Sequence, residues 1–413
     1  MIDKIQMKNN KQCLNHKYYL KIKEKGLKDS FKGVSKMLTS WIVLLLSITL
    51  TFGDFIITDE KWTGANGQYV LFKRLTNVLT NETALISYHP GGRIEQLLLR
   101  PKRNASESEA RLVSVLVGNN GNITAFLENK YYKSCPLIPW ANRIANATYT
   151  FYGTSYDLPI NEPSRNDALH GFLCQQNFTV TLERVSNFGV AVTLTKTFSN
   201  QLQNMYPGYP FQFTVNLTFE LSAGGLSVFA KVVNLESKNA MPFYMGYHPY
   251  FNVQDVGRAC IALDTRFGWV ELLTQGDLQT GPLIPTGQSI VWTQWDGQHP
   301  IGTNASNNNL PNYYDNGYRI FSKAGHFNGY NGRFLPVENR VIDTVGNVTF
   351  VLWQDSKRMV FSQLFTGLQE KTGEKGIALE PQSGSTNAYN NGDHLTVLYP
   401  GQVFQSRFGF VVE

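Results

Sequence analysis

Charged residues are scarce in this chain, and this scarcity already limits the fold. Asp, Glu, Lys and Arg make up only 16% of the 413 residues, whereas aromatic residues make up 13% and glycine contributes 35 residues. Long surface helices need polar residues along one side, while Val, Thr, Tyr and Phe favour strands. We therefore predict a fold built mostly from strands and turns.

Cysteine is rarer still, and its spacing limits the kinds of site that the chain can hold. Only Cys135, Cys174 and Cys260 follow a hydrophobic run that ends at residue 53, so they can form at most one disulfide and one thiol is left over. We find no Cys or Cys/His spacing typical of zinc and no glycine-rich loop typical of nucleotide binding. The prediction is that the protein uses no metal and no cofactor.

The net positive charge of the chain lies in the first 36 residues. This Lys-rich tail carries a net charge of +7, and the whole chain carries +6, so about −1 remains for everything that follows. A protein that binds the phosphate backbone needs a basic surface. We expect no nucleic-acid partner for the body of the protein.

Residues 37–53 are uncharged and centred on an apolar run. The run is short for a bilayer span, which needs about 20 apolar residues, and it suits the apolar region of a signal peptide. A translation start at Met37 would remove the unusually long tail. The alternative is an uncleaved signal anchor with residues 1–36 in the cytoplasm. We expect a secreted or lumenal protein, or else a type II membrane-anchored one.

Eight Asn-X-Ser/Thr triplets fit passage through a secretory lumen, although chance alone predicts about five. Glycosylation is therefore a hypothesis. The triplets begin at Asn81, Asn104, Asn122, Asn146, Asn177, Asn216, Asn304 and Asn347.

From residue 54 to the C-terminus, apolar and polar residues alternate in many short segments, as in residues 213–220. Such alternation puts one face of a strand on a core and the other in water. We predict one antiparallel β-sandwich over residues 54–413, with an Asn-rich loop at 303–316. The predicted strands are 68–74, 84–88, 179–183, 191–198, 213–220, 226–234, 349–353, 359–365 and 403–412.

Two loops contain polar residues that strands and turns do not require. Arg143 follows Asn142 and lies between apolar neighbours, where a guanidinium needs an ion pair, loop carbonyls or a ligand. His170 precedes a glycine, and from the residues alone a histidine that completes a turn explains it better than a binding role does.

Two further segments offer proton-transfer groups. His248 lies in an aromatic-rich stretch, Tyr244–Asn252, and aromatic faces suit the apolar faces of sugar rings. Such a histidine is more often a core residue than a catalyst. Glu380 ends an apolar segment directly before a proline, and burial would raise the pKa of its carboxyl group and make it a usable base.

Taken together, these segments resemble the aldose 1-epimerase, or galactose mutarotase, family. The resemblance rests on four motifs in the same order and at comparable spacing, from about residue 68 to the C-terminus. They are Asn142-Arg143-Ile144, Leu169-His170-Gly171, His248-Pro249-Tyr250-Phe251-Asn252 and Leu379-Glu380-Pro381-Gln382. One departure is Phe172, which stands where many members have a second glycine and which we expect to narrow the sugar site.

The resemblance implies a large antiparallel β-sandwich of the galactose mutarotase type that interconverts the α and β anomers of free hexoses such as glucose and galactose. It implies that Glu380 is the general base and His248 the general acid. Arg143, His170 and Asp315, together with Asn142 beside them, are implied to bind the sugar. We expect a monomer that needs only this small-molecule substrate.

Three other functions stay open. A hexose-6-phosphate epimerase would need further cations for the phosphate. A glycoside hydrolase would use two carboxylates, such as Glu380 and Asp315, but would leave the histidines unexplained. A carbohydrate-binding protein without catalysis would use the same aromatic and polar groups.

Overall fold

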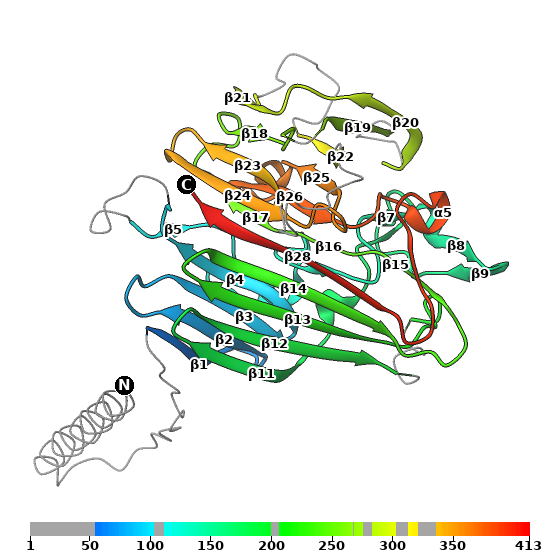
Figure 1. Ribbon diagram of the computed structural model, residues 1–413, viewed down its shortest axis with the longest axis horizontal. Coiled ribbons are helices and arrows are strands. Elements are labelled where there is room, and N and C mark those ends of the chain that lie inside the picture. Colours follow the sequence, from blue (N-terminus) through cyan, green and yellow to red (C-terminus); the bar gives the residue numbers. More distant parts are fainter. Residues whose placement is uncertain are drawn as a thin grey trace, which may run out of the picture. The chain divides into compact units, whose positions relative to one another are not determined.

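Antiparallel strands account for most of the structure, as the alternating sequence predicts (Figure 1). The computed structural model describes residues 54–102, 111–199, 206–266, 268–275, 283–302, 313–320 and 336–413. The Lys-rich tail, 1–36, and the hydrophobic segment, 37–53, lie outside these ranges. Within them, no helix has the length and apolar character needed to cross a membrane.

A nine-stranded antiparallel sheet forms one layer. Its strands, in spatial order, are β11 (Thr179–Ser186), β12 (Gly189–Phe198), β13 (Phe213–Ser222), β14 (Gly225–Asn234), β28 (Val403–Val412), β24 (Val348–Gln354), β23 (Val337–Asp343), β18 (Cys260–Ala262) and β21 (Asp296–Pro300).

A second sheet carries most of the candidate site residues. Its strands, in spatial order, are β20 (Pro285–Val291), β19 (Val270–Gln275), β22 (Asp315–Ile320), β25 (Phe361–Phe365), β26 (Gly376–Gln382), β16 (Gly246–Tyr247) and β6 (Pro136–Leu137), and β17 (Tyr250–Asn252) also pairs with β26.

A five-stranded sheet and short elements complete the fold. The sheet contains β1 (Phe55–Thr63), β2 (Tyr69–Asn77), β3 (Thr83–His89), β4 (Gly91–Leu99) and β5 (Val113–Ser114). The short strand pairs are β7 (Arg143–Ile144) with β10 (Ala168–Leu169), β8 (Thr148–Phe151) with β9 (Thr154–Asp157), and β15 (Met241–Phe243) with β27 (Thr396–Leu398). The short helices are α2 (Ile123–Glu128), α4 (Leu368–Thr372), α5 (Ala388–Asn391), η2 (Ala145–Ala147) and η3 (Leu173–Gln175).

The two smaller sheets together cover one face of the nine-stranded sheet. The five-stranded sheet packs on β11–β13, and β25 contacts β24 through a hydrogen bond between Ser362 and Gln354. Tyr247 joins all three sheets, because its ring packs on Phe408 of β28 and its hydroxyl donates to the carbonyl of Gly92 in β4. The result is a β-sandwich, which confirms the predicted fold.

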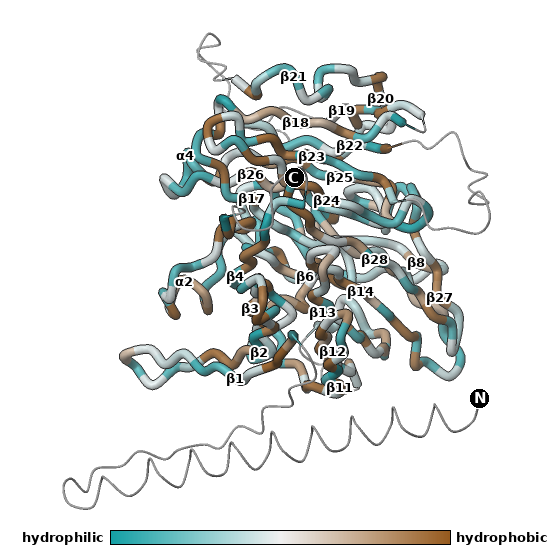
Figure 2. The backbone as a smooth tube through the Cα atoms, turned by 60° about the vertical axis from the view of Figure 1, so that its left-hand side comes forward, coloured by the Kyte–Doolittle hydropathy of each residue, from teal (hydrophilic) through white to brown (hydrophobic). Residues whose placement is uncertain are grey.

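Strand β13 shows why the alternating sequence folds in this way. Every second residue from Phe213 to Leu221 is buried, and the residues between them are partly exposed. The same alternation of apolar and polar residues recurs along other strands (Figure 2). Each strand therefore removes one apolar face from water against a common core, which is the main favourable contribution to folding.

All nine predicted strands overlap strands of the structure. The predicted loop at 303–316 is wrong at its end, because β22 already begins at Asp315, where it pairs with Phe365 of β25. The residues 303–312 lie outside the described ranges. The asparagines concealed this strand start, because Asn is typical of turns.

Candidate active site

The register of β26 places His248 opposite Glu380. Strand β17 runs antiparallel to β26, with Tyr250 paired to Ala378. In an antiparallel pair, one strand runs up in residue number while its partner runs down. The residue two positions before Tyr250 therefore faces the residue two positions after Ala378. These residues are His248 and Glu380, and the imidazole Nε2 lies 3.3 Å from the carboxyl Oε1.

Burial controls the protonation of this pair, since His248 is 5% exposed and Glu380 only 1%. Loss of water penalises the ionised form of each group. Burial therefore raises the pKa of Glu380 well above its usual value, and it lowers the pKa of His248 to about 4. Between these two pKa values the pair holds one proton, which can reside on the carboxyl or on the imidazole.

His170 lies beside this pair in a tightly held loop. Its ring centre is 5.2 Å from that of His248, and its pKa is lowered well below the usual value, first by burial. The backbone N–H of Asn142 donates to His170 Nδ1 at 3.1 Å. A neutral imidazole that accepts at Nδ1 carries its proton on Nε2, so His170 is a fixed donor at Nε2.

Arg143 connects the His170 loop, through Asn142, to Asp315. Its guanidinium makes a bidentate ion pair with Glu162, at 2.7 and 3.0 Å, and its Nη2 lies 3.4 Å from Asp315 Oδ2. The side-chain oxygen of Asn142 accepts from Arg143 Nη1 at 3.2 Å. Gln363, on β25, donates to the other oxygen of Asp315 at 2.7 Å. This buried network fixes the positions of all these groups.

The structure thus brings all six residues predicted from the sequence into one connected cluster. They are His248, Glu380, Arg143, His170, Asp315 and Asn142. The sequence analysis missed Glu162 and Gln363. Glu162 lies in a loop, and nothing in the surrounding sequence marks it as a residue of the site. Gln363 had a signal in the sequence, because it and Ser362 are polar residues among the apolar residues of β25, in which every residue is buried.

Tyrosine rings hold the two imidazoles in place. The Tyr132 ring lies 4.6 Å from the ring of His170 and 6.5 Å from that of His248. The Tyr250 ring lies 4.8 Å from His248, and its hydroxyl donates to the carbonyl of Tyr131. Such packing restricts both histidines to narrow ranges of orientation.

His170, His248 and Glu380 are also the one group of possible metal ligands that the described part of the chain brings together, with their ligand atoms within 4.8 Å of one another. In this group, His170 offers a fixed hydrogen-bond donor, and His248 and Glu380 form a pair in which one group can donate a proton and the other can accept one. The cluster can therefore bind and exchange protons with a polyhydroxyl ligand.

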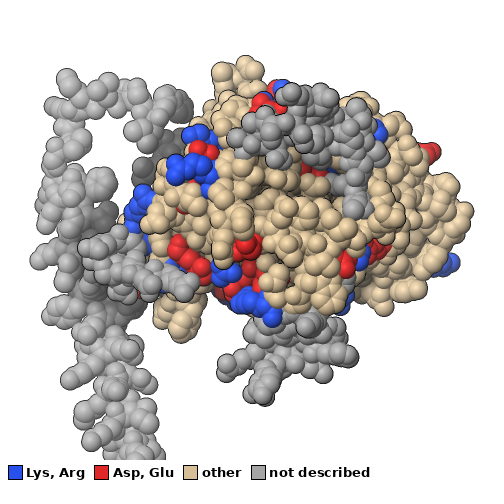
Figure 3. Space-filling view, turned by 90° about the horizontal axis from the view of Figure 1, so that it is seen from above, with Lys and Arg blue, Asp and Glu red and all other residues tan. Residues whose placement is uncertain are grey.

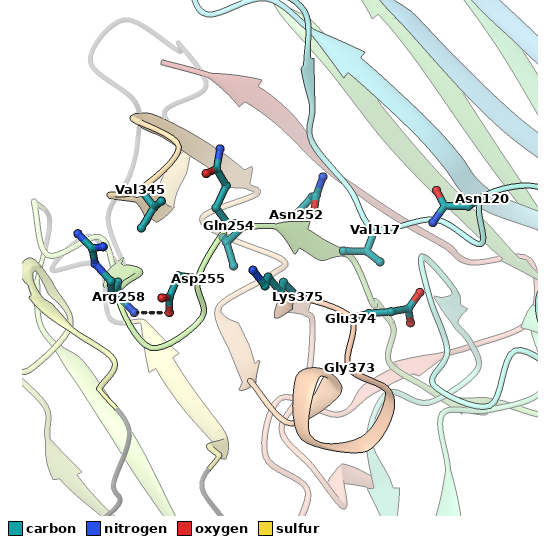
Figure 4. A pocket seen from close by; sticks show the side chains of 11 residues that line it. Val117, Asn120, Asn252, Gln254, Asp255, Arg258, Val345, Gly373, Glu374 and Lys375 are labelled. Carbon is teal, nitrogen blue, oxygen red and sulfur yellow. Dashed lines mark hydrogen bonds between the residues drawn. The ribbon is translucent and has the colours of Figure 1, made fainter.

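An open pocket of about 720 Å³ lies at the other end of β17 and β26 (Figure 4). Asn252, Gln254, Asp255, Arg258 and Lys375 are among the residues that line it. None of the six predicted site residues belongs to its lining. This pocket is therefore separate from the proton-transfer pair.

The expectation that Phe172 narrows the sugar site is wrong. The Phe172 side chain is 8% exposed and stacks on Tyr206 at 4.0 Å, with its edge toward Trp140 at 5.9 Å. It belongs to the main hydrophobic core. The ring is large and apolar, so packing it against other rings releases more water than leaving it at a polar site would.

The fold and the site together define a class: an antiparallel β-sandwich that carries a buried imidazole–carboxyl pair beside an arginine-bound aspartate. The chain belongs to the aldose 1-epimerase family, whose family model matches residues 106–410.

Individual relatives match over shorter stretches. The Escherichia coli protein YihR, itself uncharacterised, is 35% identical over 115 residues, which are 28% of this chain and 34% of that protein. A probable aldose 1-epimerase from Arthroderma benhamiae is 27% identical over 195 residues, or 44% of this chain and 42% of the relative. The chain thus spans less than half the length of each of these curated relatives.

Solved structures share the fold at low identity. A galactose mutarotase-like protein from Clostridium acetobutylicum has a TM-score of 0.65 and 20% identity, with 86% of this chain and 98% of that one covered. A galactose 1-epimerase from Lactobacillus acidophilus has a TM-score of 0.63 and 14% identity, with the same coverage. These similarities show that the fold is of the galactose mutarotase type.

The turn after His170 gives a test of how the site is held. Gly171 has φ +63°, and a Cβ there would lie 2.2 Å from the carbonyl oxygen of Ile138, whereas Gly153, with φ +79°, has open space around it. We predict that Gly171→Ala lowers the free energy of unfolding by about 1–3 kcal/mol more than Gly153→Ala does, because both share the positive φ but only one clashes.

Thermal or denaturant unfolding of the two variants measures this difference. Equal losses of stability would mean that the His170 loop is not clamped against Ile138.

Proposed function

We propose that the protein is an aldose 1-epimerase that interconverts the α and β anomers of a free hexose, with glucose and galactose as the substrates to test first. The observation that carries this proposal is the His248–Glu380 pair, 3.3 Å apart and buried. Mutarotation needs one group that accepts a proton and one that donates a proton on the same sugar, and this pair supplies both.

Ring opening follows from the pair in its charge-separated form. The Glu380 carboxylate takes the proton of the anomeric hydroxyl, the C1–O5 bond breaks, and the His248 imidazolium gives its proton to the ring oxygen. After rotation about the C1–C2 bond, Glu380 returns its proton to the aldehyde oxygen, His248 takes back the proton of O5, and the ring closes as the other anomer. The cycle consumes no co-reactant.

The surrounding groups would hold the sugar during this cycle. His170 offers an Nε2–H donor to a ring or hydroxyl oxygen, and Arg143 and Asp315 present a donor and an acceptor that are already oriented by Glu162 and Gln363. Groups fixed before the substrate arrives lose little entropy when it binds.

The contacts also favour this function over its rivals. Both carboxyl oxygens of Asp315 already accept hydrogen bonds, which makes it a poor second acid for glycoside hydrolysis. Arg143 is committed to Glu162 and Asp315, which weakens it as a site for a sugar phosphate. A sugar-binding protein without turnover would use the same contacts, so kinetics must separate the two.

We also propose that the protein works in the secretory lumen or outside the cell. Cys135 and Cys174 form a disulfide, and disulfides persist mainly in oxidising compartments. Five of the six described sequon asparagines are exposed: Asn81, Asn122, Asn146, Asn177 and Asn347.

Polarimetry on freshly dissolved α-D-glucose and α-D-galactose tests the activity. We expect the wild-type protein to speed the approach to the equilibrium rotation, and Glu380→Gln to lower kcat by about 10²–10⁴-fold, as is typical for the loss of a general base. Glu128→Gln, on the exposed end of α2, is the matched control and should keep full activity. Release of reducing ends would instead indicate a hydrolase, and binding without faster rotation a lectin-like protein.

The pH profile tests the shared proton. The pair needs one proton to act, so kcat/KM should fall at low pH as His248, with a pKa of about 4, takes up a second proton. It should fall again at high pH, as Glu380, with its raised pKa, loses the last one.

Asp315→Asn sharpens this test. The Asp315 charge raises the pKa of both groups, so its removal should move both limbs of the profile to lower pH. Movement of a single limb, or in the opposite direction, would contradict the assignment of the two limbs to this pair.

Deglycosylation tests the location. After secretion from a eukaryotic cell, peptide-N-glycosidase should lower the mass of the protein and convert occupied asparagines to aspartates, detected by peptide mass spectrometry. We expect occupancy among the five exposed sequons. Asn216 should be unmodified, because it lies within β13 and accepts a hydrogen bond from Thr195. A secreted protein without glycans would remove this support.

A further inference from the structure

The disulfide between Cys135 and Cys174 joins the loop that carries His170 to the segment 134–138, which is hydrogen-bonded to the backbone of His248. Cys135 directly precedes β6, and Cys174 lies in η3, four positions after His170. Both cysteines are buried, at 0% and 2% exposure. The side-chain amide of Asn129 donates to Cys135 Sγ at 2.8 Å and to Cys174 Sγ at 3.4 Å, so both sulfur atoms are held by the same side chain.

One side of this disulfide is bonded to the backbone of His248. The N–H of His248 donates to the carbonyl of Cys135 at 3.0 Å, and the N–H of Ser134 donates to the carbonyl of His248 at 2.8 Å. Both backbone polar groups of His248 therefore depend on the segment that Cys135 anchors. A displacement of that segment moves His248 relative to Glu380.

The other side holds the His170 loop. The N–H groups of Phe172 and Leu173 donate to the carbonyl of Ile138 at 3.0 and 3.2 Å, and Gly171 forms a bridge with Ile138. These contacts span only the residues just before Cys174. The disulfide at Cys174 adds a covalent bond directly after these hydrogen bonds, so it prevents the His170 loop from separating from the segment 134–138.

We propose that the Cys135–Cys174 disulfide is a positioning element of the candidate active site, and that its reduction lowers turnover by letting the His170 loop and His248 move apart. This inference rests on the proposed epimerase function. It also assigns the site a redox dependence: the enzyme is fully active where disulfides persist and weakened where dithiols reduce them.

The reduction is an ordinary exchange with an external dithiol. The dithiol transfers two electrons and two protons, the Sγ–Sγ bond breaks, both cysteines become thiols, and the reductant leaves as its own cyclic disulfide. Cys260 is buried and is the free cysteine of the described residues. It therefore provides a matched control.

The test compares the wild type, oxidised and reduced with dithiothreitol, with a Cys135→Ser/Cys174→Ser double variant and with Cys260→Ser. Thiol counts verify each redox state, and circular dichroism melting sets an assay temperature at which all forms are folded. We expect kcat to fall on the order of tenfold or more in the reduced and double-variant proteins, because small misplacements of catalytic groups are costly. Cys260→Ser should match the wild type, oxidised or reduced.

A second readout does not depend on turnover. Imidazole NMR signals of His170 and His248 in the ligand-free protein should shift on reduction and in the double variant, and stay unchanged in Cys260→Ser. Folded, reduced protein with wild-type kcat and unchanged imidazole signals would overturn the proposal, as would a lower melting temperature as the sole effect. If oxidised wild type shows no mutarotation, the proposed function fails, and the NMR comparison still decides whether the disulfide positions the histidines.

Discussion

The ladder between β26 and its two short partners is the constraint on which the site depends. The antiparallel register of Tyr250 with Ala378 leaves His248 no position other than opposite Glu380. Two prolines follow these residues directly, Pro249 after His248 and Pro381 after Glu380. Because proline lacks an N–H, the ladder cannot continue regularly through this point. The pairing is thus interrupted between β16 and β17, where His248 faces Glu380, while on its other side β26 pairs with β25 without a break.

Burial shifts the pKa values of His248 and Glu380 away from those of the same groups in water. An isolated charge inside a protein is costly, and both groups respond by favouring their neutral forms. A carboxyl group and an imidazole that share one proton can switch to the charged pair without exchange with solvent. The network of Arg143, Glu162 and Asp315 adds fixed charges nearby, because one guanidinium contacts two carboxylates and leaves one negative charge in excess. On the face of the molecule shown in Figure 3, acidic and basic residues of the described part lie near one another in small groups.

The sequence predicted the strands well, because period-two alternation is a local property that each strand of the sandwich repeats. It also led to five of the six predicted site residues through four short motifs, and to Asp315 through the family resemblance alone. It did not reveal Glu162, because a carboxylate in a loop is ordinarily solvated, nor the core position of Phe172, because its partners Trp140 and Tyr206 are distant in the chain. Likewise, three cysteines allowed a disulfide but gave no pairing. What escaped prediction in each case was a long-range contact rather than a local preference.

The hydrogen bond from the Asn142 backbone to His170 Nδ1 has a consequence for molecular selection. With Nδ1 occupied, His170 presents only a hydrogen toward its open side and cannot reverse its polarity. An oxygen of a ligand could accept a hydrogen bond from this N–H. An ammonium group, as in an amino sugar, has only hydrogens to offer and could not accept one. In the proposed sugar site, this single main-chain amide would therefore favour a hydroxyl oxygen over a charged nitrogen beside His170.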